Sequence, residues 1–155
     1  MGLCKLVKHL SEEQKEAVRS IGFGALLTLG ISQCPTEFSH GIVKMFNPSR
    51  RSIILTSGKE IHIEEEDVQA VLDLPRGPFE IEECIGGESG ESKYNDFLRV
   101  WRRRWGINED SGSPETFEMG KIILQNRSGD SDFKIDFVVY VVSSFLWTSQ
   151  SSRAR

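Results

Sequence analysis

Residues 64–78, EEEDVQAVLDLPRGP, contain the start, the packing face and the end of one short helix. The acidic residues come first, where negative charge is favourable because a helix N-terminus carries a partial positive charge. Val68, Val71 and Leu72 then share one face, and we expect this face to dock the helix on a core. Pro75 ends the helix, because a residue that precedes proline is pushed out of helical geometry.

The segment that leads into this helix predicts a β-hairpin. Residues 51–63 read RSIILTSGKEIHI, with two β-branched runs on either side of Ser57-Gly58. Glycine supplies the positive φ that a tight turn requires. His62 alternates with Ile61 and Ile63, so we expect its side chain to face solvent.

Helical patterns occupy most of the remaining chain. Ser11 and Gln14 form a capping-box pattern that opens a helix ending near Gly22. A second apolar segment follows at residues 25–31. An amphipathic helix before Pro48 is marked by Phe38, Ile42, Met45 and Phe46. Further helices are expected at residues 94–106, about 115–127, and 133–147. The last of these is Val-rich, which also suits a buried strand, and its length favours a helix.

Together these elements predict a mainly α fold, a compact multi-helix domain with one small β-hairpin at about residues 52–63. The domain is expected to span residues 10–147, after an N-terminal extension at residues 1–9. Residues 80–93 are rich in Gly, Ser and Glu and are expected to form a mobile loop. Residues 148–155 are expected to be a disordered tail.

The composition indicates an ordinary globular protein. The chain has 155 residues, enough for one core, and a formal net charge of −4, which gives no general attraction to nucleic acid. Charge is uneven, since residues 49–91 carry four Lys/Arg against eleven Asp/Glu. Three cysteines without a CxxC pair favour reduced thiols. The apolar run at residues 137–147 is about half the length of a membrane span, so no membrane contact is expected.

The sequence offers no pattern typical of catalysis, cofactor binding or metal binding. His9, His40 and His62 lie in three different expected elements, and none has the context of a known catalytic or zinc motif. The acids at residues 64–67 would fan out by about 100° each around a helix, so they would not converge on one ion. We therefore predict a protein that is not an enzyme, with no catalytic, cofactor-binding or metal-binding residues.

One patch does suggest contact with a ligand. Residues 99–106, RVWRRRWG, place arginines beside two tryptophans. Arginines interleaved with aromatic residues are typical of a groove for single-stranded nucleic acid. In the alternative interpretation Trp101 and Trp105 face the core with Phe97, and the arginines form the solvated side. The candidate contact residues, for nucleic acid or for a protein partner, are Arg99, Arg102, Arg103 and Arg104.

The order of these motifs resembles the plant mobile domain family, also catalogued as aminotransferase-like. That family combines a GFG-LL element near the start with a hairpin that leads into an EDVxxVLGLPxGG pattern, and an apolar helix follows. The matching positions with structural roles here are Gly22, Phe23, Gly24, Asp67, Val68, Leu72, Leu74, Pro75 and Gly77. Asp73 stands where the family has glycine. The sequence after Trp147 also departs from the family pattern, which would make this chain a truncated copy.

The resemblance implies a non-enzymatic interaction module of plant transposable-element origin. Such a module would act in the nucleus through protein or nucleic-acid contacts, with the cytoplasm as the alternative location. Some members of that family carry a protease domain for ubiquitin-like proteins. The chain could therefore also be the N-terminal regulatory fragment of such a cysteine protease polyprotein, or a degenerate copy without function.

Overall fold

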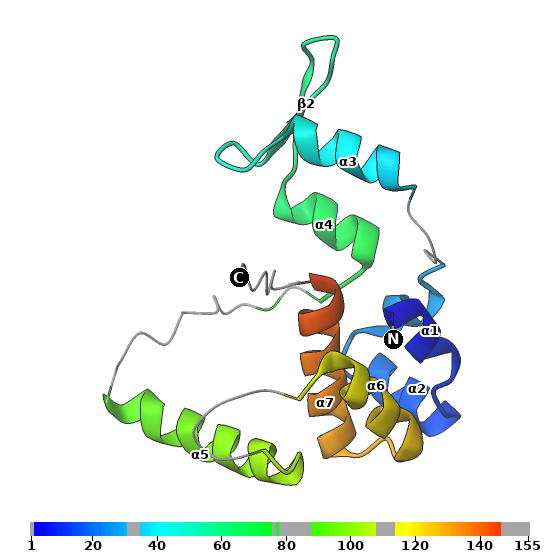
Figure 1. Cartoon of the computed structure of the whole chain (residues 1–155), viewed down its shortest axis with the longest axis vertical. Coiled ribbons are helices and arrows are strands. Elements are labelled where there is room, and N and C mark those ends of the chain that lie inside the picture. The colour runs from blue at the N-terminus through cyan, green and yellow to red at the C-terminus, as the bar shows by residue number, and fades with distance from the viewer. Residues whose placement is uncertain (1, 31–34, 76, 78–87, 108–113, 147–155) are drawn as a thin grey trace, which may run out of the picture.

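A helical core forms one end of the molecule in the computed structural model, which describes residues 2–30, 35–75, 77, 88–107 and 114–146. The core contains α1 (Leu3–Lys8), α2 (Glu12–Ser20), the 3₁₀ turn η1 (Gly24–Thr28), α6 (Thr116–Gln125) and α7 (Ser131–Val141). A π-helical turn, η2 (Val142–Leu146), continues α7. Figure 1 shows the two ends of the described chain meeting here, with α1 and α2 beside α6 and α7.

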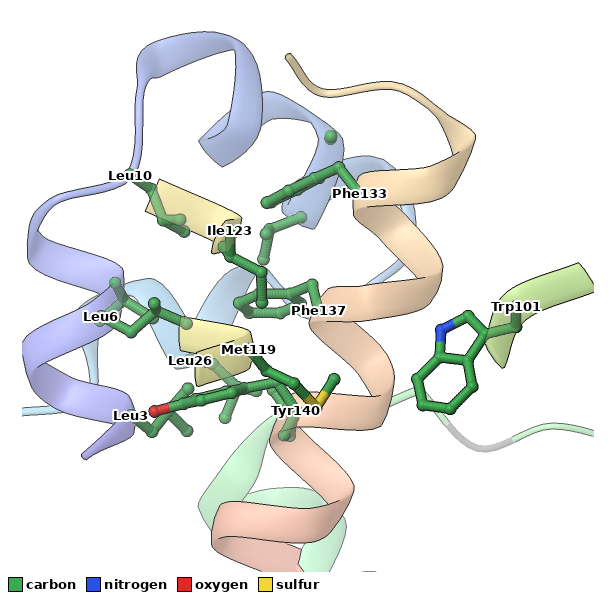
Figure 2. Packing of buried hydrophobic residues seen from close by; sticks show 14 residues of the cluster. Leu3, Leu6, Leu10, Leu26, Trp101, Met119, Ile123, Phe133, Phe137 and Tyr140 are labelled. Carbon is green, nitrogen blue, oxygen red and sulfur yellow. The ribbon is translucent and has the colours of Figure 1, made fainter. Parts of the chain in front are cut away.

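Apolar side chains from all these helices fill the core. Leu6, Leu26, Phe137 and Tyr140 are fully buried, and Figure 2 shows them pointing toward one another between α1, η1 and α7. The rings of Phe133 and Phe137 stack with their centroids 5.8 Å apart. Because each helix contributes one apolar stripe, the core depends on segments that lie at opposite ends of the sequence.

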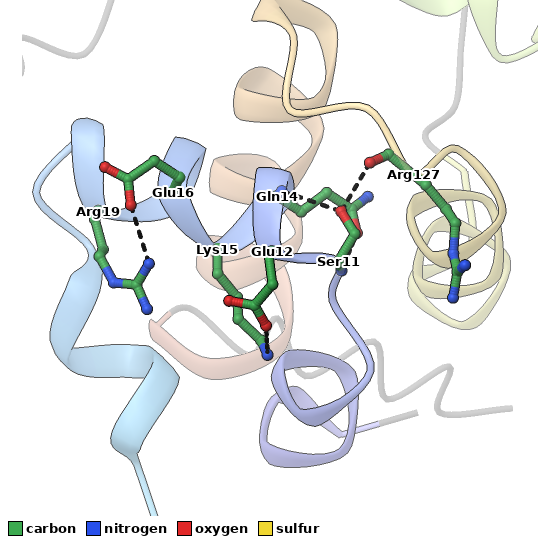
Figure 3. A network of polar contacts seen from close by, with 7 residues as sticks. All are labelled: Ser11, Glu12, Gln14, Lys15, Glu16, Arg19 and Arg127. Carbon is green, nitrogen blue, oxygen red and sulfur yellow. Dashed lines mark hydrogen bonds and ion pairs between the residues drawn. The ribbon is translucent and has the colours of Figure 1, made fainter.

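The capping box predicted at Ser11 and Gln14 is present. The Ser11 Oγ accepts from the Gln14 N–H at 3.1 Å, and the Gln14 Oε1 accepts from the Ser11 N–H at 3.0 Å. The two side chains also reach the end of α6 (Figure 3). The Gln14 Nε2 donates to the carbonyl oxygens of Ile123 and Asn126, and the Ser11 Oγ donates to that of Arg127. One local motif thus starts α2 and fixes it to α6.

A second region, which we call the arm (residues 36–75), projects from the core (Figure 1). It contains α3 (Thr36–Met45), β1 (Phe46–Asn47), β2 (Ser52–Ile54), β3 (Glu60–His62) and α4 (Glu65–Leu72). The strands form an antiparallel sheet in the order β1-β2-β3, with Ile53 opposite Ile61. Gly58 has φ +79° in the turn between β2 and β3, as the predicted hairpin requires.

The arm joins the core at a close contact between Gly22 and Pro75. Gly22 has φ +82°, and a Cβ placed there would lie 2.8 Å from the Pro75 Cγ. Leu74 packs against the core beside this contact. Asp73 ends α4 in the left-handed conformation, with φ +47°. That conformation is one that glycine adopts most readily and that Asp tolerates better than most residues.

The remaining helix, α5 (Glu88–Arg104), lies to one side of α7 (Figure 1). Its Trp101 is 7% exposed and lies on the opposite side of α7 from Leu6 and Leu26 (Figure 2). Gly106, with φ +65°, follows the helix end. Residues 108–113 and 147–155 lie outside the described part of the chain, and so does the expected disordered tail.

The fold is mainly helical with a small sheet, as predicted, and the helical interpretation of the last apolar segment is confirmed over residues 133–146, while residue 147 lies outside the described residues. Several local expectations differ. Phe46 belongs to β1 rather than to the preceding helix, because it pairs with Ile53. Residues 88–93 of the expected loop are helical, since α5 starts at Glu88, and residues 80–87 are not described. Residues 1–9 contain α1, whose Leu3, Leu6 and Val7 are buried, so packing begins before residue 10.

The expectation that Val68, Val71 and Leu72 dock α4 on the core is wrong. Val71 is 78% exposed, Val68 is 46% exposed, and α4 has no buried residue. The reason is the position of α4. Leu74 and Pro75 attach the arm beyond the end of the helix, so within the described residues no core element covers Val68 and Val71.

Candidate protein-interaction surface

The arm exposes an unusual share of large hydrophobic side chains. Within the described residues, Ser52 is the one buried side chain of the arm, and it is polar. Soluble domains expose single hydrophobic residues routinely, but a gathering of them on one region is typical of a contact surface. The exposed large hydrophobic residues of the arm are Phe38, Val43, Phe46, Ile54, Ile61, Val68 and Val71.

Part of this surface is hollowed between β3 and α4. The hollow, which we call the arm groove, has a volume of about 470 Å³. Most of its lining is aliphatic, and one imidazole and one carboxylate supply the polar groups. The lining residues are Ile61, His62, Ile63, Asp67, Val68, Val71 and Leu72. Its size is in the range of sites that accept a few side chains or a small ligand.

Acidic residues lie at the start of α4, beside the arm groove. Glu64–Asp67 are all exposed, and the Asp67 Oδ2 accepts from the Glu64 N–H at 2.9 Å. The acids therefore start the helix, as the sequence indicated, and they also give the groove a negative border. Within the described residues, no group of three His, Cys, Asp or Glu side chains gathers as metal ligands would.

Another acid stabilises the sheet. The buried Ser52 Oγ donates to the Glu60 Oε1 at 2.6 Å, and this hydrogen bond lowers the pKa of Glu60, with a smaller lowering from the charge of Arg50. The arm is thus held together by polar contacts and strand pairing rather than by a core of its own.

The tryptophan–arginine helix is organised differently from a nucleic-acid groove. The indole N–H groups of Trp101 and Trp105 both donate to the Asp136 Oδ1, at 2.9 and 3.2 Å. Arg104 pairs with Asp132 and Asp136 of α7. Arg104 is exposed, as the interpretation of the arginines as a solvated side expected, and it also joins α5 to α7 through these ion pairs. The pairing of Arg104 with these two carboxylates could not be found from the sequence, because Asp132 and Asp136 lie about thirty residues away along the chain.

The other candidate residues of this helix have separate surroundings. Arg99 pairs with Asp96 on the same helix at 3.2 Å, Arg102 is half-buried and Arg103 is exposed. Phe97, expected to join the core stripe, is 48% exposed. The structure thus separates Arg104 from the other three arginines, and it leaves an apolar residue at the surface beside them.

The residues that carried the family resemblance also divide between the two regions. Gly22 and Pro75 form the joint, Phe23 and Leu74 pack against the core, and Gly24 opens η1. Asp67, Val68 and Leu72 line the arm groove, while Gly77 is exposed beyond the joint. Five of these nine positions therefore have structural roles that many helical domains require.

The described residues contain no helix that combines the length and the apolar character of a membrane span.

Comparison with curated proteins and with solved structures gave no match. Comparison with family models overturns the resemblance to the plant mobile domain, because no model of that family matches. The resemblance rested on glycines, a proline and aliphatic residues. Unrelated folds use the same residue types for turns and for packing. The transposon origin, the nuclear location and the truncation lose their support with it. The model that does match spans residues 1–155, and the chain belongs to the family described as Domain of unknown function (DUF8566).

Proposed function

We propose that this chain is a non-enzymatic protein-interaction module whose arm binds an apolar-faced helix of a partner. The observation that carries the proposal is the arm groove, an apolar hollow of about 470 Å³ bordered by exposed hydrophobic side chains. An amphipathic helix fills such a hollow by inserting residues at positions i, i+3, i+4 and i+7. When the partner helix binds, its apolar face and the lining of the arm groove are both removed from water. This burial is the main favourable term in association.

The charge beside the groove favours a basic partner helix. Glu64, Glu65, Glu66 and Asp67 surround the start of α4, and opposite charges across an interface speed encounter and suppress wrong partners. A helix with an apolar face and lysine or arginine on its flanks would satisfy both features. We therefore expect binding that weakens, without vanishing, as salt screens the charges.

Protein binding is better supported than nucleic-acid binding. A groove for single-stranded nucleic acid stacks bases on exposed aromatic rings. Here both indoles donate their N–H groups to Asp136, and Trp101 is buried. The acidic arm would also repel phosphates. What remains for a nucleic acid is the exposed side of α5, which offers no exposed tryptophan.

The proposal is tested with short fluorescent helical peptides and the full chain. A peptide with a leucine face and lysine flanks should bind, whereas a scrambled peptide of the same composition should not. Replacing Val68 and Val71 by Asp should weaken binding at least about tenfold, and replacement of the exposed Phe117 by Asp on α6, outside the arm, serves as the control. Equal binding of the two peptides, or no effect of the groove variant, would contradict the proposal.

Labelled single-stranded DNA should be measured in the same series. Binding that falls steeply with salt, and that disappears when Arg99, Arg102 and Arg103 are replaced by Gln, would replace protein binding by nucleic-acid binding.

A further inference from the structure

Helix α5 contacts the core through one short stretch near its end. Among residues 95–104, whose side chains the structure describes, Trp101 is the one buried side chain. Trp105, one turn later, is half-buried and packs against the core. Phe97, one turn earlier on the same face, is already 48% exposed. The contact is therefore tight at the end of α5 and opens toward the middle of the helix.

A single carboxylate of α7 fixes this end of α5. The Asp136 Oδ1 accepts from the indole N–H groups of Trp101 and Trp105 and from the guanidinium of Arg104. Arg104 also pairs with Asp132, which lies one turn earlier on α7. Asp136 is 8% exposed, and a buried carboxylate needs such partners, the charged one above all. We call these five side chains the Asp136 clamp.

Apolar packing beside the clamp is incomplete. A hollow of about 370 Å³ lies where α5 and α7 face each other. Its lining residues are Ile21, Phe97, Lys134, Ile135, Val138 and Val139. Well-packed interiors leave few voids larger than a water molecule, so a hollow of this size means that Phe97 does not close the space against α7. The attachment of α5 therefore depends on the Asp136 clamp more than on apolar packing.

The core is formed without help from α5. Figure 1 shows α5 outside the bundle of α1, α2, α6 and α7. Leu6, Phe137 and Tyr140 are fully buried, and Figure 2 shows Leu6 on the opposite side of α7 from Trp101. Loss of the contact between α5 and α7 would thus leave the central packing in place.

We propose that α5 is a detachable strap, which docks on α7 through the Asp136 clamp and leaves as a unit while the core stays folded. Release uncovers Trp101 and the apolar side of α7 at residues 135–139, so docking controls the access of other molecules to this surface. A free helix of this length is only marginally stable in water, and the released strap therefore unfolds. This inference is independent of the proposed role of the arm.

Hydrogen exchange of the full-length chain, read by mass spectrometry, tests the strap. In the wild-type chain the protection factors of α5 amides should be at least about tenfold lower than those of α2 and α6, because α5 opens without global unfolding. Arg104→Gln removes the charged donor of the clamp and should lower the α5 protection factors at least about tenfold further, with α2 and α6 unchanged. Arg99→Gln is the matched control, because Arg99 pairs with Asp96 of α5 itself.

A second readout separates release of the strap from fraying of the helix. The indole N–H of Trp101 is part of the clamp, so it can exchange with solvent only when the clamp opens. Followed by nuclear magnetic resonance, this N–H should lose protection in Arg104→Gln by the same factor as the α5 amides.

Three results would overturn the inference. Equal protection of α5, α2 and α6 in the wild-type chain would make α5 an integral part of the core. Equal acceleration by Arg104→Gln and Arg99→Gln would show that the Asp136 clamp does not hold the helix. A Trp101 N–H that stays protected while the α5 amides exchange would show that α5 frays in place and is not released.

Discussion

The helical core and the arm carry similar apolar side chains but bury them to very different extents. In the core, stripes from α1, α2, α6 and α7 face one another, and residues such as Leu6 and Phe137 lose all contact with solvent. In the arm, Val68 and Val71 form an equally regular stripe that no element among the described residues covers. Periodicity thus identifies which residues share a face, but the covering partner depends on how the chain returns in space.

A region without its own core should also be less stable than the rest. Small sheets need a packed hydrophobic face for independent stability, and segments with few buried apolar contacts open with low free energy. We infer that the arm can open locally while the core stays folded. The predictions below test that difference, starting with the largest expected effect.

Truncating one apolar side chain in each region should separate the two regions most clearly. Phe137→Ala removes a fully buried ring from the core and should lower the free energy of unfolding by about 3–5 kcal/mol. Val71→Ala in the arm should change it by less than about 0.5 kcal/mol, because the side chain is exposed. Urea denaturation followed by circular dichroism measures both. A cost for Val71→Ala comparable to that for Phe137→Ala would mean that α4 is packed after all.

The polar side chain that joins α2 to α6 should be the next most sensitive position. Gln14 is 1% exposed, and its amide donates to two carbonyl groups at the end of α6. Gln14→Ala leaves these acceptors without that donor and should cost about 2–4 kcal/mol, since an unsatisfied buried group costs about 1–3 kcal/mol.

Two further variants identify which of its contacts matters. Gln14→Glu keeps an oxygen that can accept from Ser11 but loses both donors, so it should destabilise at least as much. Ser11→Ala removes mainly the helix cap and should cost only about 1 kcal/mol. A larger loss for Ser11→Ala than for Gln14→Ala would assign the stability to the cap instead of to the link between helices.

The glycines of the two regions should respond in opposite directions. Gly22→Ala places a Cβ 2.8 Å from the Pro75 Cγ at φ +82° and should cost about 1–3 kcal/mol. Gly41→Ala, inside α3 with open space around it, should raise helix stability by about 0.5–1 kcal/mol. Hydrogen exchange of the arm amides should fall in Gly41→Ala. Unchanged stability in Gly22→Ala would show that the joint can rearrange.

The sequence was sufficient for the elements whose signals are local. The capping box at Ser11, the turn at Gly58 and the acidic start of α4 each depend on residues within four positions, and each is present. The additional strand β1 was missed because Phe46-Asn47 is too short for a period of two to be visible.

The candidate surface was less predictable for a physical reason. The stripe of Val68 and Val71 was recognised, but its exposure depends on where Leu74 and Pro75 attach the arm. Likewise, the role of Arg104 depends on Asp132 and Asp136, which α7 brings to it across a long stretch of chain. Contacts between distant segments leave no local pattern, so a single sequence does not contain them in readable form.

The smallest expected effect concerns two carboxyl groups, one in each region, whose pKa values are both lowered. The Asp130 Oδ1 accepts from the Phe133 N–H at 2.8 Å at the start of α7, and this hydrogen bond lowers the pKa of Asp130. Its contribution to stability is therefore complete above the unfolded-state pKa of about 3.9. That contribution is lost as the pH falls from there through the lower pKa of the folded state.

Asp130→Asn should therefore flatten the acid dependence of the free energy of unfolding below about pH 4, while leaving stability at neutral pH nearly unchanged, because Asn is also a good cap. Urea denaturation at a series of acidic pH values measures this slope.

Glu60→Gln is the matched variant in the arm, where Ser52 lowers the pKa of the carboxyl group. If the arm opens separately from the core, Glu60→Gln should change hydrogen exchange in the arm at low pH but not the slope for global unfolding. An equal change of slope in both variants would show that the arm and the core unfold as one unit, which would contradict the inference that the arm can open while the core stays folded.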